Sequence, residues 1–201
     1  MAKKKHNETG DVVPLKLHKP PLQAISLTIG PWKVLFPNEQ NKLLISKALN
    51  NCTCAGHLNI KGYLITKNKL FLVLGAEWEH MGHKLSVFYD AMRKVIIQYT
   101  GSLERVGLNK CMPQHDHRLE ELLRYPFTRH PLFDQDLVKA ITRKRHYPLN
   151  RSPKNYNPRL ARLMNSVQNY NFCSAMDLSG ACGPVLLHGK CDDDTDENFL
   201  T

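Results

Sequence analysis

The chain has 201 residues, 42% of them hydrophobic, and a formal net charge of +10 at pH 7 with an isoelectric point near 9.4. This length suits one domain, or one domain with an extension, and the apolar content is that of a globular protein. No apolar run reaches the roughly 18 residues of a membrane-spanning helix, so we expect no membrane insertion. The positive charge indicates a polyanionic partner, with nucleic acid first.

The two ends of the chain differ in charge. Residues 1–21 are polar, basic and interrupted by prolines, which predicts a flexible basic arm. Residues 188–201 are predicted to form an acidic disordered tail, and its five acidic residues leave about +15 on the rest of the chain. Residues 22–187 are predicted to form a single domain. The start of the chain lacks the apolar run of a secretory signal, so we expect a cytoplasmic protein whose six cysteines are free thiols.

The first elements in chain order are a strand and a helix. Residues 23–29 (QAISLTI) read as a strand that ends at Gly30-Pro31, and residues 32–36 as a short continuation or a turn. Asn38 is a plausible N-cap for a helix over 39–50, in which apolar residues recur at helical spacing.

Residues 61–75 (KGYLITKNKLFLVLG) are the most strand-like stretch of the sequence. They are β-branched, aromatic and aliphatic, with one polar break at residues 66–69. A strand that is apolar on both faces is usually central in its sheet and covered on each side. We therefore expect this stretch to be the central strand.

A helix is predicted over residues 77–99, because apolar side chains follow Leu85 at offsets of 3, 7, 10, 11 and 14. Thr100-Gly101 is expected to end it. Farther on, residues 119–124 read as a short helix and residues 125–131 as a proline-bounded loop. Asp134 or Gln135 is expected to begin a helix that runs to about His146.

The segment 139–162 contains eight basic residues and no acidic one, with aromatic and amide side chains between them. This composition suits phosphate contacts combined with base stacking. Basic residues late in a helix also complement its dipole, which accounts for 143–145 but not for the fifteen residues that follow. The candidate nucleic-acid-binding residues here are Arg143, Lys144, Arg145, Tyr147, Arg151, Lys154, Tyr156, Arg159 and Arg162.

His115 and His117 form a His-x-His pair and are the candidate metal ligands. On a strand, two such imidazoles share a face and could hold a divalent ion. However, the residue between them is an aspartate and Pro113 precedes them, so the pair is expected in a loop that leads into the short helix.

The sequence also resembles a known family in two places. The first place begins at Gly62-Tyr63 and continues with Ile65, Asn68 and the aliphatic run after Asn68. It is similar to the pattern G-Y-x-I/V-M-P-N-H-x-H-L-L-L of the HUH-type tyrosine transposases, REP-associated group. The two motif histidines, which would hold a metal ion on one face of the strand, are replaced here by Lys69 and Phe71. Lysine and phenylalanine cannot hold a metal in this way, but Lys69 could contact a phosphate.

The second match lies in the C-terminal third. The family pattern there is N-P-V-x-A-G-L-V, then Y-x-Y-S-S/C-S-A-x-D-Y-x-G, then G-x-L/V. This sequence resembles it, with the spacing kept, at Asn157-Pro158 and the residues after it and at the segments 170–175, 177–180 and 183–186. In the family a nucleophilic tyrosine precedes the asparagine by four residues and attacks a DNA phosphodiester. That position holds Pro153 here, and Tyr147 is the candidate for a displaced nucleophile.

The element order and this resemblance imply an α+β fold: a ferredoxin-like antiparallel sheet with helices on one face, plus a C-terminal helical and loop extension. The resemblance also implies a bacterial protein from the context of mobile elements, and a homodimer as one assembly. We expect a catalytically inactive relative that binds hairpin or single-stranded DNA, with RNA as another partner, and that needs no cofactor.

Two alternatives stay open. The first is an active tyrosine transposase or single-strand nuclease with a relocated site at Tyr147, dependent on Mg²⁺ or Mn²⁺. The second is a non-catalytic subunit of a larger protein complex.

Overall fold

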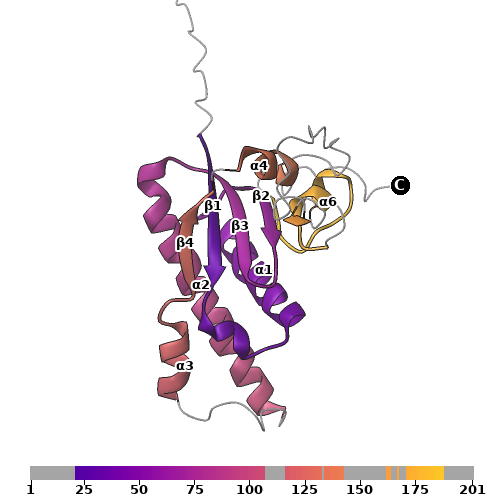
Figure 1. Ribbon diagram of the computed structural model, residues 1–201. Coiled ribbons are helices and arrows are strands. Elements are labelled where there is room, and N and C mark those ends of the chain that lie inside the picture. Colours follow the sequence, from indigo (N-terminus) through magenta and orange to yellow (C-terminus); the bar gives the residue numbers. More distant parts are fainter. Residues whose placement is uncertain are drawn as a thin grey trace, which may run out of the picture.

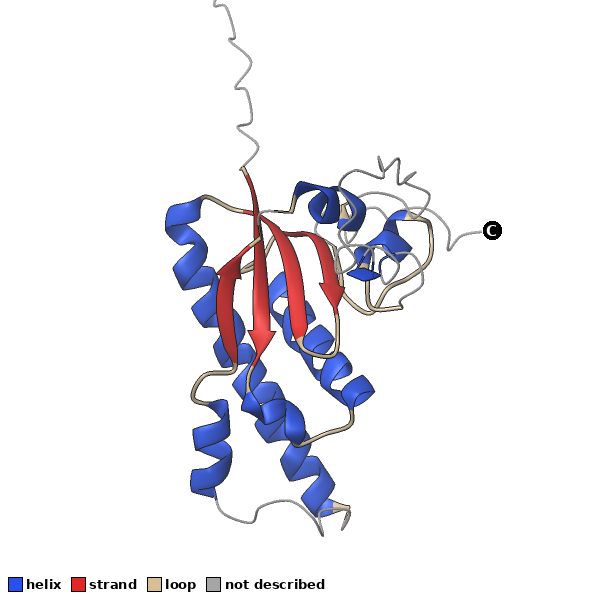
Figure 2. Ribbon diagram, in the orientation of Figure 1, coloured by secondary structure: helices blue, strands red, loops and turns tan. Residues whose placement is uncertain are grey.

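The computed structural model describes residues 21–106, 116–132, 134–142, 162–163, 167 and 171–187. Two long helices lie behind a twisted four-stranded sheet, and two short helices lie toward one side of the opposite face (Figure 1). Figure 2 shows the same arrangement as a layer of strands in front of a layer of helices. The predicted arm and tail lie outside the described residues, except for Pro21.

The sheet is antiparallel and has the strand order β2-β3-β1-β4. Its strands are β1 (Leu22–Ile29), β2 (Ile60–Ile65), β3 (Lys69–Gly75) and β4 (Phe127–Pro131). With α1 (Asn38–Cys54) between β1 and β2, and α2 (Trp78–Arg105) between β3 and β4, the chain follows the ferredoxin-like path β-α-β-β-α-β. The predicted α+β fold and ferredoxin-like sheet are therefore confirmed.

The stretch predicted as one central strand is a hairpin of two strands. Residues 66–68 turn the chain, and β2 pairs with β3 in antiparallel register from Gly62↔Val73 to Ile65↔Leu70. The Thr66 N–H donates to the Lys69 carbonyl (2.8 Å), and the Thr66 hydroxyl donates to the same oxygen (2.9 Å). The polar break was therefore the turn; of the two strands of this hairpin, β3 lies inside the sheet and β2 forms its edge.

The helical face of the sheet carries the main core. Ile25, Leu27 and Ile29 of β1 alternate inward with Leu70, Leu72 and Leu74 of β3, as expected for strands with one face on a helix layer. The predicted stripe of α2 is confirmed from Leu85 to Ile96, where its members are buried, whereas Tyr99 is half-buried. These two sets of side chains hold α1 and α2 against the sheet.

Several predicted boundaries were wrong. Helix α2 continues through Gly101 to Arg105. Gly101 does not adopt the left-handed conformation that would end the helix, and a Cβ at this position would meet no other atom within 4 Å. Helix α1 begins at Asn38 itself and no side chain caps it. Residues 31–34 form a short 3₁₀ helix, η1 (Pro31–Val34). The predicted loop 125–131 contains the edge strand β4, which pairs with β1.

The C-terminal part packs on the other face of the sheet and around its β2 edge, where Val185 and Leu187 join the main core. Helix α4 (Gln135–Ile141) begins after Asp134, as predicted, but ends at Ile141 rather than near His146. The Asp134 carboxylate caps it by accepting a hydrogen bond from the Leu137 N–H (3.0 Å). Helix α6 (Ser174–Leu178) follows a single bridge in which Cys173 pairs with Leu64. Together they cover Leu64, Phe71 and Val73 with a second apolar cluster. The remaining described helix, α3 (Asp116–Leu123), precedes β4.

Among the described residues, no helix is both long enough and apolar enough to cross a lipid bilayer.

Candidate nucleic-acid interface

Lys69 and Phe71 lie on the face of β3 that points away from α1 and α2. Phe71 is only 4% exposed and packs in the second cluster with Leu137 and Ile141. Lys69 is half-buried at the start of the strand. Phe71, which stands at the position of the second motif histidine, is thus surrounded by apolar side chains and offers no ligand to a divalent metal.

Three lysines gather at the turn between β2 and β3. The Lys33 ammonium of η1 donates to the Asn68 side-chain oxygen (2.9 Å), and the Ile29 N–H donates to the Asn68 carbonyl (2.9 Å). Asn68 thereby ties η1 and the end of β1 to the turn. Lys67 is exposed on the turn and Lys69 follows it. We call Lys33, Lys67 and Lys69 the lysine rim.

A row of polar side chains crosses the sheet next to this rim. In the strand register Thr128 of β4 lies opposite Thr28 of β1, and Thr28 lies opposite Lys69 of β3. Directly opposed residues on antiparallel strands present their side chains on the same face. Thr128 is exposed, while Thr28 and Lys69 are half-buried. We call Thr28, Lys69 and Thr128 the polar strip; it shares Lys69 with the lysine rim.

The two segments that carry the resemblance contact each other in space. The Tyr63 N–H donates to the Ser174 hydroxyl (2.8 Å), and the Tyr63 hydroxyl donates to the Asp177 carboxylate (3.0 Å). The second carboxylate oxygen of Asp177 accepts the Gly183 N–H (2.7 Å). A Cβ at Gly183 would collide with both the Tyr63 hydroxyl and the Asp177 carboxylate. These residues therefore form one buried polar lock between β2 and α6.

Gly62 has a similar role one position earlier. A Cβ there would lie 2.9 Å from the Ile141 carbonyl oxygen at the end of α4. Ser174 completes the joint, because its hydroxyl also lies in hydrogen-bonding distance of the Ile141 carbonyl. The residues of the Gly-Tyr and Ser-Ala-x-Asp segments thus hold the C-terminal extension on the sheet.

Tyr63 is held in its protonated form. Burial raises the pKa of its hydroxyl, and the negative charge of Asp177 raises it further, with a smaller opposing effect from the Val185 backbone. A phenol that keeps its proton donates a hydrogen bond and is a poor nucleophile. Tyr63 is therefore a structural residue.

The sequence-predicted site residues are only partly placed. Arg162 is described and exposed. Arg143, Lys144, Arg145, Tyr147, Arg151, Lys154, Tyr156 and Arg159 lie outside the described residues, as does His115. His117 lies in the first turn of α3 rather than in the predicted loop, and its side chain is not described. No group of three or more His, Cys, Asp or Glu side chains within the described ranges could hold a metal ion.

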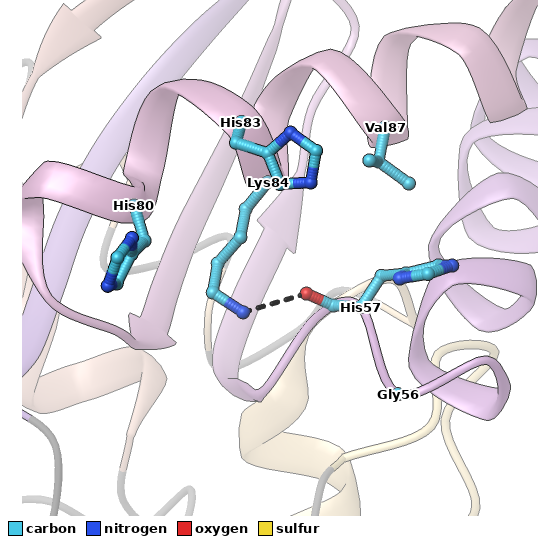
Figure 3. Close-up of a pocket in the computed structure, with 6 residues that line it drawn as sticks. All are labelled: Gly56, His57, His80, His83, Lys84 and Val87. Atoms are coloured by element: carbon cyan, nitrogen blue, oxygen red, sulfur yellow. Dashed lines mark hydrogen bonds between the residues drawn. The ribbon is translucent and has the colours of Figure 1, made fainter.

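Sequence analysis overlooked Lys33 and Lys67, and also a pocket between the end of α1 and α2. Lys67 could have been found, because a short polar break between two apolar runs is the usual signal of a hairpin turn. The pocket is lined by His57, His80, His83 and Lys84 together with Gly56 and Val87 (Figure 3). The two α2 histidines and Lys84 have helical spacing, but His57 belongs to another element, so the sequence alone does not bring them together.

Comparisons with models of protein families, with curated proteins and with solved structures found no match for this chain.

Proposed function

We propose that this protein binds single-stranded or hairpin nucleic acid, DNA in the first place, through the lysine rim and the polar strip, and that it does not cleave the strand. The lysine rim is the observation that carries this proposal. It places ammonium groups from η1 and from the β2–β3 turn beside a part of the sheet whose side chains are polar. Ammonium groups bind phosphates, and threonine hydroxyls hydrogen-bond to phosphate or sugar.

Charge and the resemblance support the same proposal. A formal charge of +10 attracts a polyanion at long range, and the basic residues at 143–162 would extend the cationic surface if they lie near it. The resemblance to HUH-type tyrosine transposases is carried by two segments that contact each other here, and it implies a nucleic-acid-binding protein. The absence of cleavage is proposed because Lys69 and the buried Phe71 stand in place of the two motif histidines and Pro153 stands in place of the nucleophilic tyrosine.

The experiment compares two variants of equal charge change. One carries Lys33→Gln, Lys67→Gln and Lys69→Gln; the matched control carries Lys47→Gln, Arg105→Gln and Arg118→Gln, which are exposed on α1, α2 and α3. Binding to a labelled single strand and to a hairpin is followed by fluorescence anisotropy across a salt series. We expect the rim variant to bind at least about tenfold more weakly. Its salt slope should fall by roughly 2, since each phosphate of a single strand that a lysine neutralises adds about 0.7 to the slope.

Two results would contradict this proposal. Equal loss of affinity in both variants would mean that net charge alone attracts the strand. A cleaved product or a covalent protein–DNA adduct on a denaturing gel, with Mg²⁺ present, would show an active nuclease or transposase instead.

A further inference from the structure

A pocket on the helical side of the molecule is lined largely by nitrogen donors. It has a volume of about 250 Å³ and lies between the loop after α1, which supplies Gly56 and His57, and one side of α2. His80, His83 and Lys84 project from α2 at spacings of three and four residues, which places them along one side of the helix (Figure 3).

Lys84 has a fixed position in this pocket. Its ammonium donates to the His57 carbonyl oxygen (3.0 Å), as the dashed line in Figure 3 shows, and so joins α2 to the loop. An ammonium group has three hydrogens, so two further donors are available after this bond. An imidazole ring adds one N–H donor when it is neutral and two when it is charged.

Two of the three acidic groups near the pocket have a basic side chain beside them. Glu77 lies 3.7 Å from the His80 imidazole, and Asp90 pairs with Arg93 on the same helix. Glu79, also in the first turn of α2, is exposed. No carboxylate lines the pocket itself, so its lining favours an anion over a cation.

A second hollow of about 360 Å³ adjoins the first and shares His57 and Val87 with it. It is lined by apolar and polar side chains such as Ala91 and Gln98, and also by Lys94 and by Asp90, whose carboxylate pairs with Arg93. Together the two hollows fall in the size range of small-molecule sites, about 300–1,000 Å³. The first pocket offers hydrogen-bond donors to an anionic group, and the second hollow offers apolar and polar side chains to an organic group.

We propose that this pocket binds the phosphoryl group of a small phosphorylated molecule. His57, His83 and Lys84 contact the phosphoryl oxygens, and the organic part lies along Val87 and Ala91 toward Gln98. A phosphoryl group suits this lining because its several acceptor oxygens match donors that converge from two elements. The pocket lies on the helix layer, whereas the polar strip lies on the opposite face of the sheet, so this site is independent of the proposed nucleic-acid surface.

The test follows the imidazole resonances of the full chain by NMR at constant ionic strength. Inorganic phosphate and adenosine monophosphate are the probes, adenosine and sodium chloride are the controls, and an oligonucleotide without terminal phosphate is the third arm. We expect saturable shifts of His57 and His83 with phosphate and with adenosine monophosphate. Lys84→Gln should weaken this binding about tenfold, the effect of removing one charge-assisted hydrogen bond, and Lys47→Gln should leave it unchanged.

His83→Gln is a second variant that leaves the Lys84 to His57 bond in place, and it should also weaken binding. The inference is wrong if neither phosphate nor adenosine monophosphate gives a saturable shift, or if Lys47→Gln weakens binding as much as Lys84→Gln. It is also wrong if only the oligonucleotide shifts His57 and His83, because the pocket would then belong to a nucleic-acid surface. A failure of the lysine-rim experiment would leave these outcomes unaffected.

Discussion

The two halves of the sheet face that points away from α1 and α2 differ in chemistry. Over β2 and β3, Leu64, Phe71 and Val73 are covered by the C-terminal extension. At the end of β1, the start of β3 and the adjoining part of β4, the polar strip replaces these apolar side chains. Lys69 and Phe71 are two residues apart on one strand and share a face, yet one reaches solvent and the other does not.

This difference shows how one strand can serve two purposes. Two residues on the same face of a strand can have different environments when different elements pack over them. The part of this face over Leu64, Phe71 and Val73, which we call the packed half, stabilises the C-terminal extension. The part that carries the polar strip, which we call the polar half, is open to a ligand. Changes in the packed half should therefore affect stability, and changes in the polar half should affect binding.

The largest effect is expected for Phe71→Ala. Removing a buried aromatic ring leaves a cavity, so the free energy of unfolding should fall by about 3–5 kcal/mol in urea denaturation. Lys69→Ala, on the same face of the same strand, is the control and should cost less than about 1 kcal/mol. Similar destabilisation in the two variants would remove the distinction between the two halves.

Gly183→Ala should destabilise the joint between β2 and the C-terminal extension. The new methyl group would collide with the Tyr63 hydroxyl and the Asp177 carboxylate, both held by hydrogen bonds, at a cost of about 1–3 kcal/mol. Gly82→Ala is the matched control, since a Cβ at Gly82 meets nothing within 4 Å and alanine favours the helix. A neutral or stabilising Gly183→Ala would show that the polar lock is loose.

Alkaline pH should weaken the same lock. An unfolded tyrosine ionises near pH 10, whereas folded Tyr63 keeps its proton because its pKa is raised. The folded state then binds more protons, so the free energy of unfolding falls as the pH rises above about 10. In Tyr63→Phe this fall should be smaller, while stability at neutral pH drops by about 2 kcal/mol because Asp177 loses a donor.

The measurement needs a Cys52→Ala background. Burial raises the pKa of the Cys52 thiol from its usual 9.0 to about 11, which adds a fall of stability in the same direction from about pH 9. Burial also raises the pKa of Tyr89, so the difference between Tyr63 and Tyr63→Phe in this background, from pH 7 to 11, isolates the contribution of Tyr63. An identical pH profile with and without Tyr63 would contradict the assigned role of its hydroxyl.

The smallest change in stability is expected for Thr28→Val in the polar strip. The two side chains have nearly the same shape, and Thr28 is half-buried, so stability should change by less than about 0.5 kcal/mol. Affinity for a single strand should fall two- to fivefold because one hydroxyl donor is removed, about 0.5–1 kcal/mol. Unchanged affinity would remove Thr28 from the proposed interface.

Where an apolar pattern is long and regular, the sequence was sufficient to predict the fold. The α2 stripe and β1 followed from their periodicity, and the order of elements together with the family resemblance led to the ferredoxin-like sheet. The strand β4 was missed because only Phe127 of its five residues is buried, so it shows almost no alternation. The hairpin was missed because its polar turn was taken as an interruption within one strand.

The candidate site depends on contacts that sequence spacing does not reveal. Lys33 and Asn68 are 35 positions apart, and Tyr63 and Asp177 are 114 apart. Likewise, the covering of Phe71 by α4 required knowledge of which face the extension occupies. Local patterns specify elements, whereas sites arise from the packing of elements that are distant in sequence.

The most direct test of the proposed interface is a map of backbone amide shifts during titration with a single-stranded oligonucleotide. We predict that the largest shifts lie at Thr28, Thr128 and the turn residues 66–69, and that residues 85–96 of α2 shift little. Shifts concentrated on α1 and α2, or no saturable shifts at low salt, would contradict the claim that the polar half of the sheet binds nucleic acid.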